Sequence, residues 1–375
     1  MQVIELRDEG SGLDAFIVID HELFPICAGG TRMLPDVDVP EVARLARAMT
    51  WKLAACRVPC GGAKAGIRFA GGTRADVLAA YNRALDPYRE VFLTGPDMGT
   101  SPADFLEREE EPLPLWAQSH DGLGMDDLAT GHGVKAAAEA ALAVLGRTLD
   151  GAALVLEGFG KVGAGTARAC TRAGARLVAV STVSGLLVDP DGLDADELIA
   201  LRTRFGDRFV EHGPEPVRPR EALFDLECDV LVPGARPDSI TPEVAERVNC
   251  AVVVPAANVP YAPGAVGRLR ERGILALPDF VSNSGGVRLY ASVSESEEPR
   301  AALAMIEGMV RNDVARVLDV AGKLGITPLA AGLQEGRDYL VQATGAPDEV
   351  LDELFRTEIH IPDKAGPSLK TMPLN

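Results

Sequence analysis

Residues 152–164, AALVLEGFGKVGA, carry the pattern that decides the fold of this 375-residue chain. The apolar run 152–156 predicts a buried strand, and the following residues predict a helix that ends at Gly174. Between them lies a GxGxxG loop formed by Gly158, Phe159, Gly160, Lys161, Val162 and Gly163. In dinucleotide-binding loops of this kind the first glycine makes the turn, the second admits a pyrophosphate, and the third lets the helix pack on the strand. Its place between a strand and a helix favours a nucleotide site over a merely structural turn.

The sequence after this loop continues to alternate between strands and helices. Apolar strands are predicted at 176–180, 228–232, 251–254 and 274–277. Helices are predicted at 133–145, before the loop, and at 300–323. This alternation is typical of a doubly wound parallel sheet, whose ligand lies at the carboxyl ends of the strands.

The first part of the chain is organised differently. Residues 14–33 predict two strands around a polar turn, and residues 40–52 predict a helix that ends at Lys52. Segments 58–67 and 94–100 predict loops that hold functional groups. The expected fold class is therefore α/β with two domains. The first is a substrate-binding and oligomerisation domain at 1–128 with a returning segment at 325–375, and the second is a Rossmann-type domain at 129–324.

Composition excludes several kinds of partner. The formal charge of −18 and the pI near 4.8 oppose binding to nucleic acid or to an anionic membrane surface. The N-terminus lacks a secretory signal, and no apolar stretch approaches the roughly 20 residues of a membrane span. The six cysteines show neither a CxxC pair nor metal-ligand spacing. These features predict a cytoplasmic protein with reduced thiols and no metal site.

Lysine is rare among the 37 basic residues, so each retained lysine raises the question of why arginine would not serve. Lys52 and Lys64 flank Gly61–Gly62, and neither lies in a run of opposite charge. Two ammonium groups that converge depress each other's pKa, which can bring one to about 7–8 and make it a general base. Taken alone, however, each lysine also fits a solvated surface group, and Asp97 also fits a turn former.

Seven segments together resemble the glutamate/leucine/phenylalanine/valine dehydrogenase family. They occur in the family's order over roughly residues 15–335. They are GGTRM (29–33), MTWKLAACRVPCGGAKAGI (49–67), GPDMGT (95–100), ATGHGV (129–134), LEGFGKVG (156–163), AAN (256–258) and PDFVSNSGGV (278–287).

The resemblance implies NAD(P)-dependent oxidative deamination of an L-amino acid to a 2-oxo acid and ammonia. It implies that Lys52 holds the substrate α-carboxylate, with Gly29 and Gly30 beside it. Lys64 would be the base that activates water, and Asp97 would exchange protons with the amino group. A homo-oligomer is also expected.

The resemblance also assigns the cofactor site. Thr130 and Asn258 would contact the nicotinamide end of the cofactor. The further expected contacts are the six loop residues and Ser181, Thr182, Gly234, Ala235, Ala257 and Asn283. A carboxylate that binds the ribose usually follows such a loop by about 20 residues, where this chain has Ser181–Thr182. NAD and NADP therefore both stay open.

The side-chain pocket is expected at Ala28, Gly95, Val287 and Tyr290, none of which is charged. The glutamate branch of the family has a lysine at the position of Ala28 and a serine at that of Tyr290. We therefore expect a substrate with an apolar, branched or aromatic side chain. Glutamate dehydrogenase is the alternative within the enzyme class, and a non-catalytic nucleotide-binding regulatory subunit is the alternative outside it.

Three residues depart from the family pattern. His132 stands where TGRGV has arginine, Pro255 where a carboxylate often precedes GAN, and Ala65 where glycine often follows the catalytic lysine. None of them removes a reacting group.

Overall fold

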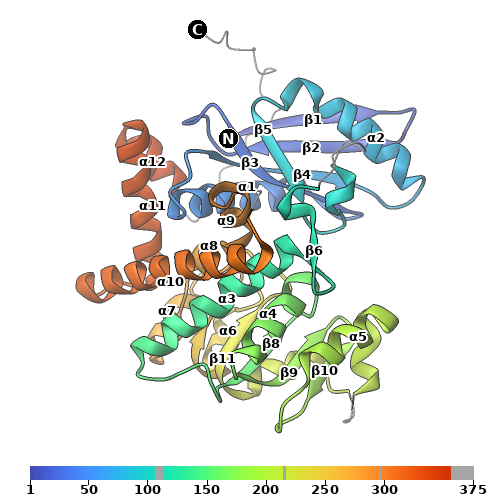
Figure 1. Cartoon of the computed structure of the whole chain (residues 1–375). Coiled ribbons are helices and arrows are strands. Elements are labelled where there is room, and N and C mark those ends of the chain that lie inside the picture. Colours follow the sequence, from blue (N-terminus) through green and yellow to red (C-terminus); the bar gives the residue numbers. More distant parts are fainter. Residues whose placement is uncertain (106–112, 214–216, 295–296, 356–375) are drawn as a thin grey trace. The chain divides into compact units, whose positions relative to one another are not determined.

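The computed structural model describes residues 1–105, 113–213, 217–294 and 297–355. These residues form two compact units, one of residues 1–105 with 336–355 and one of residues 113–335 (Figure 1). The second unit begins before and ends after the range 129–324 that we expected, because helix α3 (Met125–Val144) is continuous across residue 129. Residues 356–375 of the expected returning segment lie outside the described part of the chain.

The first unit is built on a five-stranded sheet of order β1-β2-β4-β3-β5. Strands β3, β4 and β5 are parallel, whereas β2 runs antiparallel to both β1 and β4. The strands are β1 (Gln2–Asp8), β2 (Leu13–Ile19), β3 (Cys27–Leu34), β4 (Gly61–Arg68) and β5 (Phe92–Pro96). The helices are α1 (Val39–Ala55), α2 (Arg74–Leu85) and α12 (Asp348–Leu354), with short 3-10 turns at Asp86–Tyr88 and Pro102–Asp104.

Alternation along β2 gives this sheet two apolar faces. Ile17 packs in a core with Tyr81 of α2, whereas its neighbours Phe16 and Val18 pack with Val42 of α1. Successive strand residues point to opposite faces, so α1 and α2 cover opposite sides of the sheet. Helix α1 is capped by Asp38, whose carboxylate accepts a hydrogen bond from the backbone N–H of Glu41 at 2.8 Å.

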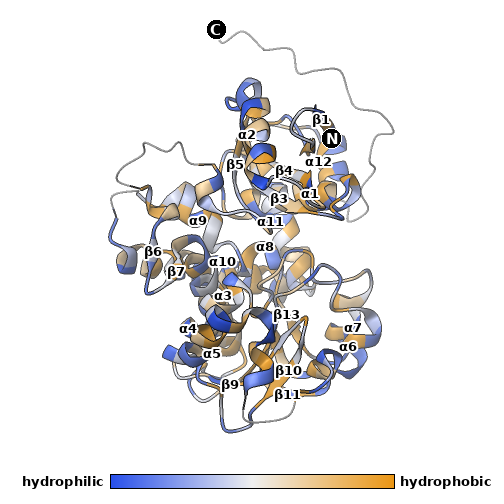
Figure 2. Ribbon diagram, turned by 90° about the vertical axis from the view of Figure 1, so that its right-hand side faces the viewer, coloured by the Kyte–Doolittle hydropathy of each residue, from blue (hydrophilic) through white to orange (hydrophobic). Residues whose placement is uncertain are grey.

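The second unit is built on a six-stranded sheet of order β10-β9-β8-β11-β12-β13. Helices α3 and α4 cover one face, and α6 and α7 cover the other (Figures 1 and 2). The strands are β8 (Ala153–Glu157), β9 (Arg176–Thr182), β10 (Gly185–Val188), β11 (Glu227–Pro233), β12 (Asn249–Val253) and β13 (Leu275–Ala276), and a small hairpin joins β6 (Ser119–His120) to β7 (Leu123–Gly124).

The helices of this unit occupy the intervals between the strands. They are α4 (Lys161–Arg172), α5 (Ala195–Phe205), α6 (Pro242–Arg247), α7 (Ala265–Glu271), α8 (Asp279–Ser282), α9 (Gly285–Ser292) and α10 (Pro299–Leu324), with 3-10 segments at Leu115–Ala117, Gly206–His212 and Arg220–Asp225. Helix α11 (Pro328–Thr344) crosses the division between the two units. Among the described helices, none is long and apolar enough to span a membrane.

The expected α/β class with a Rossmann-like parallel sheet is confirmed. Three details were wrong. Segment 58–67 was predicted as a loop, but its residues 61–67 belong to strand β4. The helix predicted at 133–145 begins at Met125, so Thr130 lies inside it. Strand β10 is an antiparallel edge strand that we did not predict, joined to β9 by a tight turn in which the Ser184 N–H donates to Thr182 Oγ1.

Candidate active site

The first unit contains a buried cluster of opposite charges. Lys64, in the middle of β4, places Nζ 2.9 Å from Oδ2 of Asp97, which follows β5. Arg32 of β3 donates from Nε to the same oxygen at 3.2 Å. The side chains of Lys64 and Arg32 are each 6% exposed and that of Asp97 is 15% exposed. Three adjacent strands thus bring two cations to one carboxylate.

The two cations fix the charge of this carboxylate. Burial opposes ionisation of Asp97, but Lys64 and Arg32 outweigh it and hold the pKa of Asp97 well below its usual range. Our premise that Lys64 lacks a neutralising partner was therefore wrong, because the loop after β5 brings in a carboxylate that is distant in sequence. Arg32 was missed altogether, although it lies two residues after Gly30 in the GGTRM segment.

The loop that carries Asp97 is tied to the sheet by Thr100. The Asp97 N–H donates to Thr100 Oγ1 at 2.8 Å, and that hydroxyl donates to the Thr31 carbonyl at 2.8 Å. Thr100 is buried. These two hydrogen bonds thus fix the loop that carries the Asp97 carboxylate to strand β3.

Small residues make room around the Lys64 ammonium. Gly30 pairs with Gly95 across β3 and β5. A Cβ at Gly30 would lie 3.1 Å from Lys64 Nζ and 2.9 Å from the Pro96 carbonyl oxygen, and one at Gly29 would lie 1.7 Å from the Ala63 carbonyl oxygen. Ala28, two residues before Gly30 and so on the same face of β3, is half-buried. The structure therefore groups Ala28, Gly30 and Gly95 with Lys64.

Lys52 lies in the last turn of α1, which packs directly on β4. A Cβ at Gly62 would lie only 2.3 Å from the backbone nitrogen of Thr50, so glycine is required for this approach. The helix is also anchored by Arg47, whose Nε lies 2.8 Å from Oδ2 of the buried Asp20. Lys52 itself is 6% exposed. Gly62, which lies between Lys52 and Lys64 in the sequence, therefore allows α1 to pack closely on β4.

In the second unit, the GxGxxG loop has the backbone of a nucleotide-binding turn. Gly158 has φ +87°, and a Cβ there would lie 3.0 Å from the Gly234 carbonyl oxygen. A Cβ at Gly163 would lie 2.3 Å from the Gly158 carbonyl oxygen, so the third glycine lets α4 pack. At Gly160, which is exposed and caps α4, a Cβ would meet nothing within 4 Å. The fold therefore requires the outer glycines, and the central one leaves the helix N-terminus open to an anion.

The predicted nicotinamide contacts lie on neighbouring segments of this unit. Asn283 Nδ2 donates to the Ala257 carbonyl at 2.9 Å and to Asn258 Oδ1 at 3.2 Å. Its Oδ1 is buried without a hydrogen-bond partner among the described residues. Thr130 Oγ1 donates to the Asp126 carbonyl at 3.0 Å. A buried acceptor in need of a donor suits a carboxamide, so these residues fit a nicotinamide.

The remaining predicted cofactor residues are placed as follows. Gly234 and Ala235 follow β11 directly and contact Gly158. Ser181 and Thr182 end β9 and are buried, and Thr182 Oγ1 donates to the Asp207 carbonyl at 2.8 Å. No carboxylate side chain takes the place of the ribose-binding acid on the Ser181–Thr182 segment itself. Lys161 and Val162, which open helix α4, are exposed and half-buried respectively, and Phe159 is buried.

Two carboxylates in the first turn of α3 were not anticipated. Burial and the neighbouring Asp126 raise the pKa of Asp127 to about 7. The Tyr290 ring lies 5.2 Å from that of Trp116 and its side chain is 45% exposed, while Val287 on the same helix is half-buried. The sequence feature that could have revealed this cluster is the Asp126–Asp127 pair, just before the ATGHGV segment.

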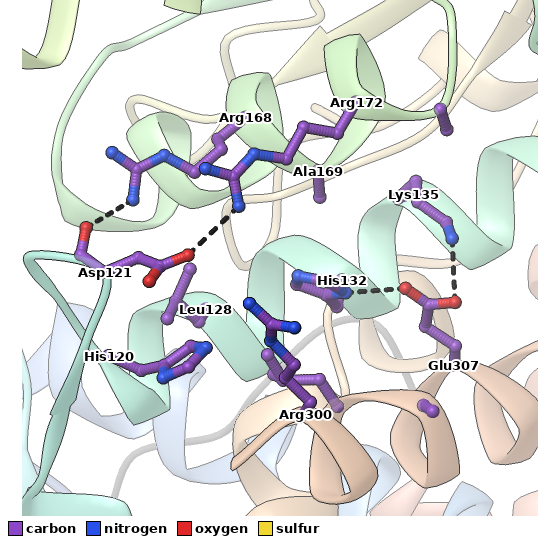
Figure 3. A pocket seen from close by; sticks show the side chains of 13 residues that line it. His120, Asp121, Leu128, His132, Lys135, Arg168, Ala169, Arg172, Arg300 and Glu307 are labelled. Carbon is purple, nitrogen blue, oxygen red and sulfur yellow. Dashed lines mark hydrogen bonds and ion pairs between the residues drawn. The ribbon is translucent and has the colours of Figure 1, made fainter. Parts of the chain in front are cut away.

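A separate polar pocket of about 350 Å³ lies beside helices α3, α4 and α10 of the second unit (Figure 3). His132 Nδ1 and Lys135 Nζ lie 2.6 and 2.7 Å from the two carboxylate oxygens of Glu307. Arg172 lies 3.1 Å from Asp121. His132, which departs from the family pattern, thus has a structural role here. In the part of the chain that the structure describes, no group of His, Cys, Asp and Glu residues could hold a metal ion.

An open glycine loop on a parallel sheet and a buried lysine–aspartate pair on a second sheet define a two-unit α/β protein of the dinucleotide-binding class. Known proteins narrow this class. Residues 122–318 match the model of the Glutamate/Leucine/Phenylalanine/Valine dehydrogenase family, and residues 1–106 match the model of its dimerisation domain. The chain belongs to this family, as its sequence motifs predicted.

Named relatives agree with this assignment. Glutamate dehydrogenase A2 of Halobacterium salinarum is 33% identical over 287 residues, and an NAD-specific glutamate dehydrogenase of Staphylococcus aureus is 34% identical over 283 residues. Each match covers 69% of this chain and 66% of the relative, so the chain spans about two thirds of their length. The hetero-hexameric glutamate dehydrogenase of Thermus thermophilus, solved in a leucine-bound form, has a TM-score of 0.79 at 26% identity and covers 92% of this chain and 88% of its own.

Proposed function

We propose that this protein catalyses the reversible NAD(P)-dependent oxidative deamination of an L-amino acid to a 2-oxo acid and ammonia. The observation that carries the proposal is the Lys64–Asp97 pair, 2.9 Å apart and largely withdrawn from water. A buried acid and base in hydrogen-bond contact can pass a proton between them, as the two proton transfers of deamination require. Membership of a dehydrogenase family supports the same reaction.

Each residue of the first unit has a proposed role. Lys52 binds the α-carboxylate of the amino acid, and Gly29 and Gly30 leave room for it. Lys64, in its neutral form, takes a proton from the attacking water and becomes an ammonium. Asp97 relays a proton from that ammonium to the departing amine. Because Arg32 also binds Asp97, the carboxylate keeps a cationic partner while Lys64 is neutral.

The residues of the second unit fit a dinucleotide. Gly158, Gly160, Gly163 and the N-terminus of α4 would hold its pyrophosphate, and Thr130, Asn258 and Asn283 its nicotinamide. When bound, the nicotinamide accepts the hydride from the substrate α-carbon. NAD and NADP both remain candidates, because the Ser181–Thr182 segment carries no acid to repel a 2′-phosphate, and one named relative is NAD-specific.

We further propose that the substrate side chain is uncharged. Ala28 and Gly95 lie on the strands beside Lys64 and carry no charge, and the resemblance adds Val287 and Tyr290 to the pocket. A substrate γ-carboxylate would find no cation at Ala28, and burying an unpaired carboxylate costs several kcal/mol. Apolar, branched or aromatic side chains suit these residues.

Glutamate is the second candidate substrate. It is favoured by the names of the curated relatives, which are glutamate dehydrogenases. A regulatory subunit without catalysis is disfavoured by the intact set of Lys52, Lys64 and Asp97.

One assay tests these proposals together. Formation of reduced cofactor is followed by absorbance with NAD and with NADP separately, against a panel of amino acids, and in reverse with 2-oxo acids and ammonia. We expect turnover with at least one apolar amino acid and a kcat/KM for glutamate at least about 10²-fold lower. A glutamate value at or above every apolar one would restore the glutamate assignment, and no turnover with any pair would favour the regulatory subunit.

Assembly and location are proposed on other grounds. The match to a dimerisation domain supports the proposed homo-oligomer. The Thermus relative is a hetero-hexamer and supports only assembly into an oligomer. All six cysteines are free thiols, which suits the reducing cytoplasm. Sedimentation of the purified chain would test the first point.

A further inference from the structure

Cys228 and Cys250 occupy directly paired positions on two neighbouring strands. Cys228 is the second residue of β11 and Cys250 the second of β12, and the two residues are partners in the parallel register. Paired residues of adjacent strands point to the same face, and such strands lie about 4.7–4.9 Å apart. A disulfide needs Cα atoms about 4.4–6.8 Å apart. The parallel register thus gives the two cysteines a backbone separation compatible with a disulfide.

The pair lies on the wall of a pocket. Both cysteines line a pocket of about 530 Å³ at the amino ends of the strands, the edge of the sheet opposite the GxGxxG loop. Cys250 is half-buried, whereas Cys228 is 9% exposed. Arg147, Arg176 and Asp229 line the same pocket. A small molecule with both positive and negative groups can therefore enter this pocket and reach the Cys250 thiol more easily than the Cys228 thiol.

The two thiols are chemically unequal. Hydrogen bonding to Cys250 and burial raise the pKa of the Cys228 thiol. The Cys228 thiol therefore keeps its proton, which makes it a poor first nucleophile. Exposure and hydrogen bonding assign the same order, with Cys250 attacking and Cys228 following.

The other four cysteines, Cys27, Cys56, Cys60 and Cys170, are all buried. Cys27 and Cys60 donate from Sγ to the backbone carbonyls of His21 at 3.5 Å and Ile26 at 3.2 Å, and burial raises the pKa of each. Cys170 is completely buried in α4. These thiols have the surroundings of structural cysteines.

We propose that Cys228 and Cys250 form a redox-active dithiol that closes to a disulfide by exchange with a small-molecule disulfide of the glutathione type. This site is separate from the proposed dehydrogenase site and does not depend on that function.

The exchange proceeds in two balanced steps. The Cys250 thiolate attacks one sulfur of the glutathione disulfide, so that a mixed disulfide forms and one glutathione thiolate leaves. Cys228 then loses its proton and attacks Cys250 Sγ, which forms the Cys228–Cys250 bond and releases the second glutathione. The protein loses two electrons and two protons, and one glutathione disulfide becomes two glutathione molecules.

The test exposes the folded full-length chain to glutathione disulfide, blocks remaining thiols by alkylation and maps the peptides by mass spectrometry. In the wild type we expect two of the six thiols to disappear into one cross-linked peptide pair, and dithiothreitol to restore them. Cys228→Ser should stop at one glutathionyl group on Cys250. Cys250→Ser should lose no thiol at position 228. Cys170→Ser is the matched control and should still form the cross-link.

Other results overturn the proposal. One is a wild-type chain that keeps all six thiols at oxidant levels that oxidise a reference dithiol. Another is a wild-type chain that stops at glutathionylated Cys250. A cross-link that forms only after unfolding, or that joins other cysteines, would equally refute it. The wild-type map does not depend on the folding of any variant.

Discussion

The two units treat a buried aspartate in opposite ways. In the first, Asp97 is held by Lys64 and Arg32, and these cations outweigh burial and lower its pKa. In the second, burial and the like charge of Asp126 raise the pKa of Asp127 to about 7. The first unit thus keeps a charge inside the protein by pairing it with two cations.

In the second unit, the proposed nucleotide site is formed by glycines, which expose the backbone because they have no side chains. Its loop offers backbone N–H groups at an open helix N-terminus, and Gly160 has free space above it. Mutations of the charged residues in the first unit and of the loop glycines in the second should therefore have different effects. Substitutions in the first should affect chemistry, and substitutions in the second should affect cofactor affinity or folding.

The largest effect is expected at Lys64. Lys64→Ala should lower kcat by about 10²-fold or more, because it removes the proposed base. Asp97 keeps Arg32 as a partner in this variant, so the fold should persist. Cofactor affinity, measured by calorimetry, should change little because the glycine loop lies in the other unit. Wild-type turnover in Lys64→Ala would remove Lys64 from the mechanism.

Lys323→Ala is the matched control for this change. Lys323 pairs with Asp319 at 2.6 Å, but its side chain is 71% exposed. Exposed ion pairs contribute little, so this variant should keep wild-type kcat and stability. Circular dichroism of both variants separates a catalytic loss from unfolding.

The second prediction compares two glycines of the loop. Gly160→Val should weaken cofactor binding about 10-fold or more, because a side chain would fill the space proposed for the pyrophosphate. It should not unfold the sheet, since its Cβ meets nothing within 4 Å. Gly163→Val should instead destabilise the unit, because its Cβ would lie 2.3 Å from the Gly158 carbonyl oxygen. Calorimetry and thermal melting of the pair test this, and unchanged affinity in Gly160→Val would place the dinucleotide elsewhere.

The sequence predicted local features of this fold more fully than distant ones. The strand, loop and helix around Gly158 follow from periodicity and glycine spacing alone, and so does α1 with its Asp38 cap. Strand β10 was missed because its four residues are paired with β9 through a turn that carries no Asn-Gly or Asp-Gly signal.

The charge partners of the site were harder to predict. Asp97 and Arg32 meet Lys64 only because β3, β4 and β5 are adjacent in the sheet, and strand order is not written in local pattern. The lysines were found by their flanking glycines, whereas their electrostatic environment was misjudged. The contacts of Lys64 with residues distant in sequence therefore determine its electrostatic environment, which the spacing of the lysines could not predict.

The third prediction concerns substrate choice in the first unit. Ala28→Lys would supply a cation where the resemblance places the substrate side chain, so kcat/KM for glutamate should rise about 10-fold or more. Ala28→Met, which adds comparable length without charge, is the control and should not raise it. An equal effect of both variants would show that pocket shape, and not charge, excludes glutamate.

The smallest expected effect concerns Asp127, the unpaired counterpart of Asp97. Its folded pKa of about 7 lies above the ordinary aspartate value of 3.8, so ionisation costs folding free energy. This penalty is absent below about pH 4, grows between about pH 4 and 7, and is complete above that range. Asp127→Asn removes the charge at nearly constant volume and should stabilise the protein at pH 8. The rise from 3.8 to about 7 corresponds to about 4 kcal/mol, at about 1.4 kcal/mol per pKa unit. Because Asp127 is only half-buried, we expect about half of this, about 2 kcal/mol. The gain should shrink as the pH falls, which urea titrations at pH 5 and 8 would measure. Asp191→Asn, at an exposed position of the same unit, is the control and should show no such trend. A stability gain for Asp127→Asn that does not depend on pH would mean that side-chain packing, and not the buried charge, distinguishes the two aspartates.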